Sequence, residues 1–449
     1  MKNGINTRAL THLQDSLVKI SKGAQLAIPL IKATEARWYH QVTRVQWNTL
    51  FAAQAGWLLD AMDVMLYAFA LTTLRSEFNF SNEEAGWVAS ATLFTAAAGG
   101  IGFGVLADQI GRKRALSTTL LIYSLASAGT ATVGLLKWPI SGLAITPLVQ
   151  LIFWRGLLGF GMGGEWACGA ALVAETWPAQ LRGRAIALMQ SGWALGYILA
   201  ALLSAAILPW LGWRVLFLVG VLPALLIIWV RRHVPETLEI LPGAERASPL
   251  EVFGPQFRRF TLGAGGVAVC VLIAYWGVFT WLPGFLASPV AKGGAGLSIV
   301  KSSWWIIPVQ VGAFFGYLSF GLISDRLGRK PAFILYLLVT AVVTPVYGYA
   351  ATNAVLLMCL GPVLGFFGSG YFALFGAMVS ELFPKRIRAT ALGVIYNIGR
   401  AASAASPSLV GALADRYGVG SALGVTSLFL LAGAALMLTL PETRGKELD

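Results

Sequence analysis

The chain has 449 residues, of which 57% are hydrophobic and 12% are charged. Soluble proteins carry about 25% charged residues, so this composition excludes an ordinary soluble enzyme. The formal net charge of +13 comes from Lys and Arg scattered among the loops, so a nucleic-acid-binding protein is not expected either.

Apolar runs long enough to cross a hydrocarbon core of about 30 Å recur along most of the chain. They do not show the period-two alternation of a transmembrane β-barrel. The expected fold class is therefore an all-α membrane protein. The predicted spans lie near residues 47–74, 84–107, 115–136, 147–174, 182–208, 213–230, 260–287, 302–324, 331–350, 353–379, 388–414 and 419–440.

One long polar break divides these twelve predicted spans into two groups of six. The predicted segments are an N-terminal tail at 1–46, a six-helix bundle at 47–230, a linker at 231–259, a second six-helix bundle at 260–440 and a tail at 441–449. Of the 33 Lys and Arg, the loops opposite the termini hold only Arg75, Lys137, Arg214, Lys292, Lys301 and Arg416. The positive-inside rule then predicts that both termini are cytoplasmic.

The two halves repeat each other in sequence. A Glu-x-x-Pro-x-x-x-Arg pattern at 175–182 recurs 206 residues later, at 381–388. A Gly-x-x-x-Asp-x-x-Gly-Arg-Lys pattern at 104–113 recurs 217 residues later, at 321–330. The difference of about 11 residues predicts an insertion in the first half, and the loop at 137–146 is the natural place for it.

The repeated Gly-x-x-x-Asp-x-x-Gly-Arg-Lys pattern resembles the signature of the major facilitator superfamily. Within that superfamily, Asp60-Ala-Met-Asp63 in the first span and Gly163-Gly-Glu-Trp166 in the fourth look like the acid:proton symporters, the sialate/lactate and aromatic-acid groups. The resemblance implies twelve transmembrane helices in two pseudo-symmetric bundles. It also implies a secondary transporter that moves a small organic carboxylate inward with a proton by alternating access.

Ionisable side chains inside the spans are few, and each costs at least about 2.5 kcal/mol to insert. Asp60 and Asp63 lie three residues apart, on adjacent parts of one helix face, and we expect them to bind the coupling proton. Glu165 is a second candidate for the proton. The alternatives are that one aspartate caps a helix or pairs with an arginine, and that Glu165 neutralises an arginine of a neighbouring helix.

Arg400 lies in an otherwise small and apolar stretch, and a guanidinium at membrane depth needs an anion. We expect a substrate carboxylate to bind it through a bidentate pair of hydrogen bonds. The alternative is a salt bridge to a first-span aspartate. The other candidate substrate-binding residues are Asn397, Tyr396, Tyr275, Trp276 and Arg155, although aromatic side chains at such positions more often lie in the core or at the lipid interface.

The repeated loop motifs predict gates that set the balance between the conformational states. We expect an Asp at a helix end to accept hydrogen bonds from Arg and from the first N–H groups of a neighbouring helix. The candidate gating residues are Asp108, Arg112, Asp325, Arg329, Glu175, Arg182, Glu381 and Arg388.

Two other functions remain open at this point: a sugar porter, and a transporter-like membrane sensor. An enzyme is not expected, since no nucleophile, base and orienting group occur together near any span. The sequence contains no P-loop, no metal-ligand cluster and no cofactor motif, so the proton is the expected coupling ion. We expect a monomer in a bacterial inner membrane whose partners are a small organic anion and the lipid bilayer.

Overall fold

The computed structural model describes residues 42–135, 139–140, 143–234, 249–384 and 387–444. Most of the predicted N-terminal tail, 1–46, lies outside them, as does much of the linker. The contacts divide the chain into Met1–Trp47 and a second unit, Asn48–Asp449, which holds nearly all of the described helices.

The described residues are almost entirely helical, as the composition predicts. In the first half the helices are α2 (Arg44–Phe78), α3 (Asn82–Ile110), α4 (Arg112–Ala131), α5 (Pro147–Thr176), α6 (Ala179–Val219) and α7 (Pro223–His233). In the second half they are α8 (Arg258–Ala287), α9 (Ile299–Leu327), α10 (Arg329–Tyr349), α11 (Ala354–Gly370), α12 (Phe372–Leu382), α13 (Arg388–Ser403), α14 (Ala405–Tyr417) and α15 (Val419–Met437). Short 3-10 helices occupy Pro249–Phe253, Val290–Lys292 and Ala350–Thr352.

The helices make the twelve crossings that the apolar runs predict. Gly212 has non-helical angles (φ 76°, ψ 174°) and separates the fifth and sixth crossings within α6. The tenth crossing comprises α11 and α12, and the eleventh comprises α13 and α14. By length and hydropathy alone, eight helical segments of the described residues can span a membrane, and one of them, Leu181–Val230, covers two crossings.

Polar residues cap several of these helices where the loops end. The Ser81 side chain accepts from the backbone N–H of Glu84, and Glu84 accepts from Ser81 in return, which forms a capping box at the start of α3. The side chains of Thr146, Ser298 and Asn353 each accept a hydrogen bond from a backbone N–H and so cap α5, α9 and α11, respectively. These caps satisfy N–H groups that the first helical turn leaves unpaired.

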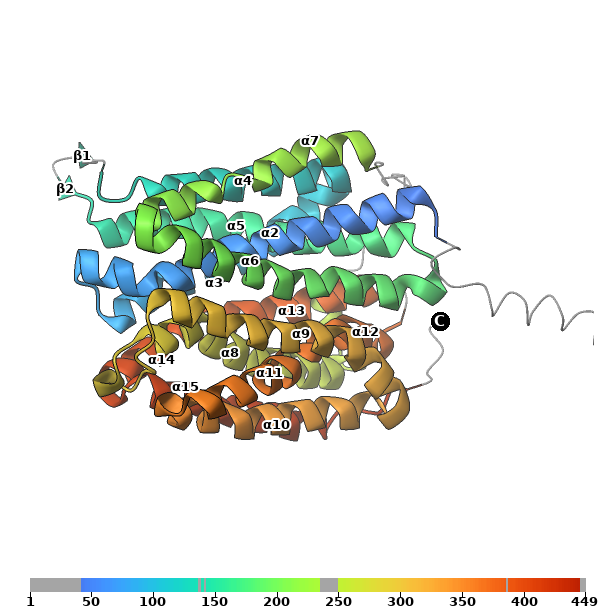
Figure 1. Cartoon of the computed structure of the whole chain (residues 1–449). Helices are drawn as coiled ribbons and strands as arrows, with labels where there is room; N and C mark the ends of the chain where they lie inside the picture. Colours follow the sequence, from blue (N-terminus) through green and yellow to red (C-terminus); the bar gives the residue numbers. More distant parts are fainter. Residues whose placement is uncertain (1–41, 136–138, 141–142, 235–248, 385–386, 445–449) are drawn as a thin grey trace, which may run out of the picture. The chain divides into compact units, whose positions relative to one another are not determined.

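Figure 1 shows the helices of the second unit in two groups, blue to green for the first half and yellow to red for the second. Within the groups, α3 packs on α5 and α9 packs on α11. Glycines make this close approach possible: a Cβ at Gly163 would clash with the α3 backbone, and one at Gly365 would clash with the α9 backbone. These glycines are therefore packing residues.

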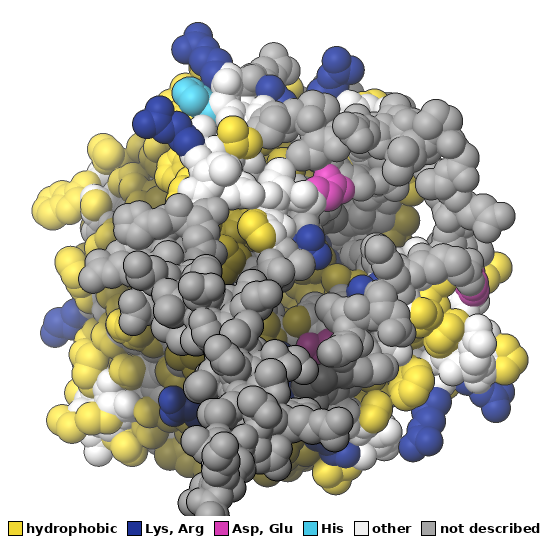
Figure 2. Space-filling view, turned by 90° about the vertical axis from the view of Figure 1, so that its right-hand side faces the viewer, with side chains coloured by type: hydrophobic (Ala, Val, Ile, Leu, Met, Phe, Trp, Pro, Cys, Tyr) yellow, Lys and Arg dark blue, Asp and Glu magenta, His cyan; other side chains and the backbone are white. Residues whose placement is uncertain are grey.

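Helices α3 and α6 of the first half make the main contacts with the second half. α6 packs on α9, and α3 packs on both α13 and α14. We call the end of the unit where α3, α5, α9 and α12 finish the terminal face, and the other end the opposite face. The terminal face is at the right of Figure 1 and faces the viewer in Figure 2, where Lys and Arg side chains surround it and hydrophobic side chains cover the flanks.

The predicted insertion between α4 and α5 forms the one departure from an all-helical fold among the described residues. Strands β1 (Pro139–Ile140) and β2 (Leu143–Ala144) pair antiparallel there, with Pro139 opposite Ala144. The short hairpin lies at the opposite face (Figure 1). Two paired residues per strand are too few for the apolar pattern to reveal.

Candidate functional site

Among the residues that the structure describes, five charged side chains are buried inside the crossings. Asp60, Asp63 and Glu165 are fully buried, while Arg155 is 1% and Arg400 is 2% exposed. Four of the five belong to the first half, and only Arg400 comes from the second. They fall into two clusters with different surroundings.

The first cluster, called the Asp63 cluster, consists of Asp63, Ser127 and Arg155. Ser127 Oγ donates to Asp63 Oδ1 and lies 3.1 Å from the carbonyl oxygen of Phe217. Arg155 donates to the backbone carbonyls of Asp63 (3.3 Å) and Val64 (3.2 Å). These contacts connect α2, α4, α5 and α6, all within the first half.

Arg155 also has aromatic neighbours. Its guanidinium carbon lies 5.3 Å from the centre of the Tyr67 ring and 5.8 Å from that of Phe217. Most of the contacts of Arg155 are thus with α2 and its neighbours. This geometry favours a role in holding α2 over the predicted direct contact with substrate.

The second cluster, called the Arg400 cluster, consists of Asp60, Glu165 and Arg400. Asp60 and Glu165 interact electrostatically with each other and with Arg400. All four carboxylate oxygens of Asp60 and Glu165, and Arg400 Nε, lack a hydrogen-bond partner among the described residues. No ion pair within 4.0 Å joins Arg400 to a carboxylate in the described part of the chain. The three charges come from α2, α5 and α13, so this cluster connects the two halves.

Asp60 and Asp63 have different nearest partners, although the charges of Asp63 and Arg155 also act on Asp60. Three residues along a helix leave two side chains about 60° apart around the axis, as expected for adjacent parts of one face, and about 4.5 Å apart along it. That difference directs Asp63 toward Ser127 and leaves Asp60 facing Arg400. Arg155 and Glu165 are likewise separate, as their spacing along α5 predicts.

Glu165 is oriented by a glycine of α2. A Cβ atom placed on Gly56 would clash with Glu165 Oε1, so the carboxylate lies directly against this backbone. Any larger residue at position 56 displaces the carboxylate. Gly56 is a site residue that the sequence pattern did not identify.

Tyr396 and Trp166 form an aromatic wall beside Arg400. The Arg400 guanidinium carbon lies 5.1 Å from the centre of the Tyr396 ring. The Tyr396 ring stacks on Trp166 of α5 at 4.5 Å, and Trp166 Nε1 donates to Gln190. The prediction that Tyr396 accompanies Arg400 agrees with this arrangement, whereas Trp166 and Gln190 were not singled out as binding residues.

Tyr275 and Trp276 contact the first half through Trp193 of α6. Trp193 Nε1 donates to Tyr275 Oη at 2.6 Å, and the rings of Trp193 and Trp276 meet edge to face at 5.7 Å. Trp276 and Arg155 line one small cavity between α2, α3, α5 and α8, together with Thr280. Asn397, another predicted substrate-binding residue, packs against Gly100 of α3. Its Nδ2 donates to the backbone carbonyl of Gly393.

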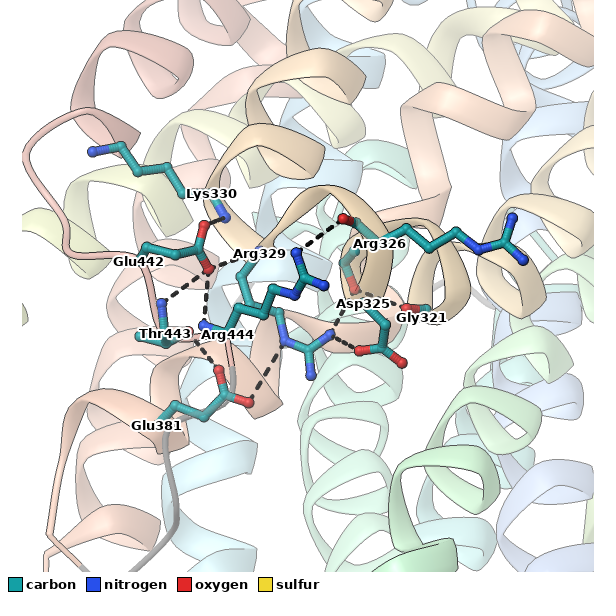
Figure 3. Close-up of polar contacts among 10 residues, drawn as sticks. Gly321, Asp325, Arg326, Arg329, Lys330, Glu381, Glu442, Thr443 and Arg444 are labelled. Atoms are coloured by element: carbon teal, nitrogen blue, oxygen red, sulfur yellow. Dashed lines mark hydrogen bonds and ion pairs between the residues drawn. The ribbon is translucent and has the colours of Figure 1, made fainter.

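The second-half gating motif forms a network at the terminal face (Figure 3). Arg329 pairs with Asp325 at 2.6 Å and lies 3.6 Å from Glu381. Thr443 of the C-terminal segment donates to the other Glu381 oxygen. Asp325, Arg329 and Glu381 thus come together as predicted, and the contacts described for them stay within the second half.

Glu442, which the sequence reasoning did not place in this network, occupies the start of α10. Its carboxylate accepts from the backbone N–H groups of Arg329 (2.8 Å), Lys330 (3.1 Å), Thr443 (3.0 Å) and Arg444 (2.9 Å). Partial burial acts to raise the pKa of Glu442, but these four donors outweigh it and hold the pKa below its usual range. The capping role expected of Asp325 thus belongs to Glu442.

The remaining candidate gating residues lie at or near the ends of helices. Asp108 and Arg112 lie at the α3–α4 junction, but their side chains are outside the described set. Glu175 and Arg182 flank the turn between α5 and α6, and both residues are exposed. Arg388 starts α13 and donates to the Phe383 carbonyl at 3.4 Å. In the described residues, no group of three His, Cys, Asp or Glu side chains has the arrangement of a metal site.

Sequence comparisons place these observations in a family context. The profile of the Major Facilitator Superfamily matches residues 55–307 and 285–448. A probable 4-methylmuconolactone transporter of Cupriavidus pinatubonensis is 35% identical over 418 residues, covering 91% of this chain and 93% of the relative. The niacin transporter NiaP of Acinetobacter baylyi is 30% identical over 443 residues, covering 91% and 97%. The sialic acid transporter NanX of Escherichia coli is 29% identical over 407 residues, covering 90% and 95%.

Solved structures share the fold. A D-xylose–proton symporter superposes with a TM-score of 0.69 at 22% identity, covering 90% of this chain and 100% of that chain. The xylose transporter XylE of E. coli, in a partially occluded inward-open conformation, gives a TM-score of 0.68 at 19% identity, with the same coverage. At these identities the likeness concerns the fold alone.

Proposed function

The chain belongs to the major facilitator superfamily, and from this premise we propose that it takes up a ring-bearing or unsaturated organic monocarboxylate together with one proton. Its family makes it a membrane transporter and not an enzyme. The observation that carries the proposal is the buried Arg400, a permanent cation with no carboxylate within ion-pair distance among the described residues.

A substrate carboxylate satisfies the Arg400 guanidinium in charge and in geometry. Its two oxygens match the paired N–H groups of guanidinium, and such charge-assisted bonds are about twice as strong as neutral ones. The ring of Tyr396 lies beside the guanidinium, and Trp166 stacks behind it. A cargo that has both a carboxylate and a flat apolar body fits this combination.

Charge balance in the Arg400 cluster couples a proton to the cargo. In a site of low dielectric constant a net charge is costly, so the empty cluster is most stable with one carboxylate ionised beside Arg400 and the other protonated. A substrate carboxylate that binds Arg400 displaces the ionised acid, which then takes up a proton. The predicted stoichiometry is one proton per monocarboxylate, with no net charge moved.

Asp60 is the acid that exchanges this proton in our scheme. Arg400 interacts electrostatically with both Asp60 and Glu165, and we assign the exchange to Asp60 because the Glu165 carboxylate is packed against Gly56. Glu165 then keeps its proton through the cycle. Our scheme gives Asp63 no exchange role, because Ser127 donates to its Oδ1 and the nearby cation Arg155 belongs to the same half, although Asp63 Oδ2 has no hydrogen-bond partner among the described residues.

The names of the relatives support a cyclic or unsaturated acid as cargo. Those relatives transport 4-methylmuconolactone, niacin and sialic acid, and another, 29% identical, is a cis,cis-muconate transport protein. Aromatic rings from both halves surround the proposed site, and flat cargo stacks well on such surfaces. The proposal includes a monomer in a bacterial inner membrane, the setting that the bacterial relatives suggest. The distribution of Lys and Arg supports cytoplasmic termini.

Uptake into proteoliposomes tests the proposal. The panel contains nicotinate, benzoate, cis,cis-muconate, sialate, lactate and glucose, each with and without an inward proton gradient. An imposed potassium diffusion potential tests electroneutrality. We expect one ring-bearing or unsaturated acid to accumulate with the proton gradient and its rate to be independent of the potential.

Arg400→Gln is the decisive variant, and Arg400→Lys is its conservative partner. The first removes the cation and should abolish acid uptake, while the second keeps the charge but loses the bidentate geometry and should leave partial activity. Glucose uptake that is indifferent to Arg400→Gln would instead identify a sugar porter. Potential-driven acid uptake would contradict the one-to-one stoichiometry.

A further inference from the structure

The Gly-x-x-x-Asp-x-x-Gly pattern occurs a third time in the chain. The first two copies are at 104–111 and 321–328, at the terminal face. The third reads Gly-Ala-Leu-Ala-Asp-Arg-Tyr-Gly at 411–418. It ends α14 and lies at the opposite face, where the internal repeat predicts no such motif.

The backbone at the end of the third copy matches the other two. The closing glycines Gly111, Gly328 and Gly418 have φ/ψ of 102°/150°, 105°/155° and 83°/155°. Positive φ at these angles favours glycine. In each copy the next helix begins at the following residue, so three junctions share one local geometry.

The side chains after the closing glycine differ. In the second copy Arg329 follows and pairs with Asp325 within the same half. In the third copy Val419 and Gly420 follow, so the closing glycine is not followed by an arginine that could pair with Asp415 as Arg329 pairs with Asp325. The carboxylate of Asp415 is therefore available to a partner from elsewhere.

That partner is the start of α3, in the other half of the protein. Asp415 Oδ1 accepts from the backbone N–H of Asn82 at 3.2 Å and from Asn82 Nδ2 at 2.6 Å. Asp415 Oδ2 accepts from the backbone N–H of Glu83 at 3.1 Å. A carboxylate at a helix N-terminus is favourable because it satisfies free N–H groups and faces the positive end of the helix dipole.

The backbones approach closely around this contact. Cβ atoms at Gly86 and Gly411 would clash with the backbones of Pro407 and Asn82, respectively. Ser90 Oγ lies 3.2 Å from Ser408 Oγ across the same interface. Arg75 of α2 adds an electrostatic interaction with Asp415. The opposite face is thus closed where α3 meets α14.

We propose that the third motif copy is the gate of the opposite face, in which Asp415 holds the two halves together by capping α3. Alternating access requires this contact to break whenever the opposite face opens. The cap stabilises the closed state and so biases the empty protein toward opening at the terminal face. The meaning of the gate rests on the proposed transport function, but its test reads conformation alone.

Disulfide trapping between α3 and α14 measures how strongly the protein favours the state in which the opposite face is closed. Ser90→Cys and Ser408→Cys are introduced after Cys168, Cys270 and Cys359 are replaced by Ser, and crosslinking is followed in membranes under mild oxidation. Asp415→Asn in this background should slow crosslinking by roughly 3- to 30-fold, the range expected for loss of a capping carboxylate. Asp415→Glu keeps the charge and should restore much of the rate.

Asp325→Asn is the matched control, because it makes the same substitution in the second copy at the other face. It should not slow Ser90–Ser408 crosslinking, because any weakening of the terminal-face gate favours the state in which the opposite face is closed. Size-exclusion profiles show whether each variant is folded, and Asn82→Ala provides a second route to weaken the cap. Crosslinking that is unchanged by both Asp415→Asn and Asn82→Ala would overturn the proposal, even if transport proves to be as described.

Discussion

The Asp63 cluster and the Arg400 cluster both contain at least one buried carboxylate and an arginine, but the two clusters differ in their hydrogen bonds and in the halves that contribute to them. In the Asp63 cluster, Ser127 and Arg155 hold α2 through hydrogen bonds made within one half. In the Arg400 cluster, the carboxylate oxygens of Asp60 and Glu165 lack hydrogen-bond partners among the described residues, and the cation comes from the other half. Burial alone therefore does not identify a working charge. Two features separate the clusters. Asp63 has a hydrogen-bond donor on one carboxylate oxygen, although Asp63 Oδ2 and Arg155 Nε lack partners among the described residues, whereas neither oxygen of Asp60 or Glu165 has one. In addition, both moving halves contribute charges only to the Arg400 cluster.

We expect the largest difference in transport between variants of the two α2 aspartates, Asp60 and Asp63. In Asp60→Asn, exchange of unlabelled for labelled acid should persist, but accumulation driven by one pH unit, about tenfold at one-to-one coupling, should disappear. Asp63→Asn keeps an acceptor for Ser127 and should still accumulate substrate. Equal loss of accumulation in both variants would remove the distinction between the clusters.

Arg155→Met tests whether the Asp63 cluster is structural. The substitution removes the donor to two α2 carbonyls and the cation near Asp63. We therefore expect the free energy of unfolding to fall by roughly 3 kcal/mol. Thermal unfolding in detergent measures the effect. The matched control is Arg214→Met, whose half-exposed pair with Glu77 at 2.9 Å should contribute less than about 1 kcal/mol. A stable variant that no longer transports would place Arg155 in the binding site instead.

Gly56→Ala tests whether the orientation of the Glu165 carboxylate matters for uptake. The added methyl group would clash with the end of a flexible side chain, so we expect Glu165 to move and the uptake rate to fall modestly, with little change in folding. Gly265→Ala is the control, because a Cβ there meets no atom within 4 Å. Full activity in Gly56→Ala would show that the orientation of Glu165 is unimportant.

Glu442→Gln should have the smallest effect, because the carboxylate is exposed and water screens it. The lowered pKa of Glu442 means that its contribution to stability is present above about pH 4, the usual carboxyl range, and is lost as the pH falls through the folded-state value. Unfolding midpoints of wild type and Glu442→Gln should therefore differ near neutral pH and converge in acid. A difference that persists in acid would contradict this pH dependence.

Much of the fold was predictable because bilayer thickness imposes the length of apolar runs. Twelve crossings, two halves and the insertion at 137–146 all follow from the positions of apolar and charged residues. The break at Gly212 falls in the predicted gap between the spans 182–208 and 213–230, whereas no proline or charge marks the break at Tyr371. Such breaks depend on packing against neighbouring helices.

The sequence by itself also identified the five buried charges, since ionisable residues in apolar runs are conspicuous. Only the tertiary structure decided their partners. Whether Asp60 or Asp63 faces Arg400 depends on the rotation of α2 against α5 and α13, which no spacing along one helix encodes. Likewise Asp415 resembles Asp325 in its motif, yet it caps α3 because folding brings residues 82 and 415 together. Local pattern determines what a side chain can do, and helix packing determines with which partner it does it.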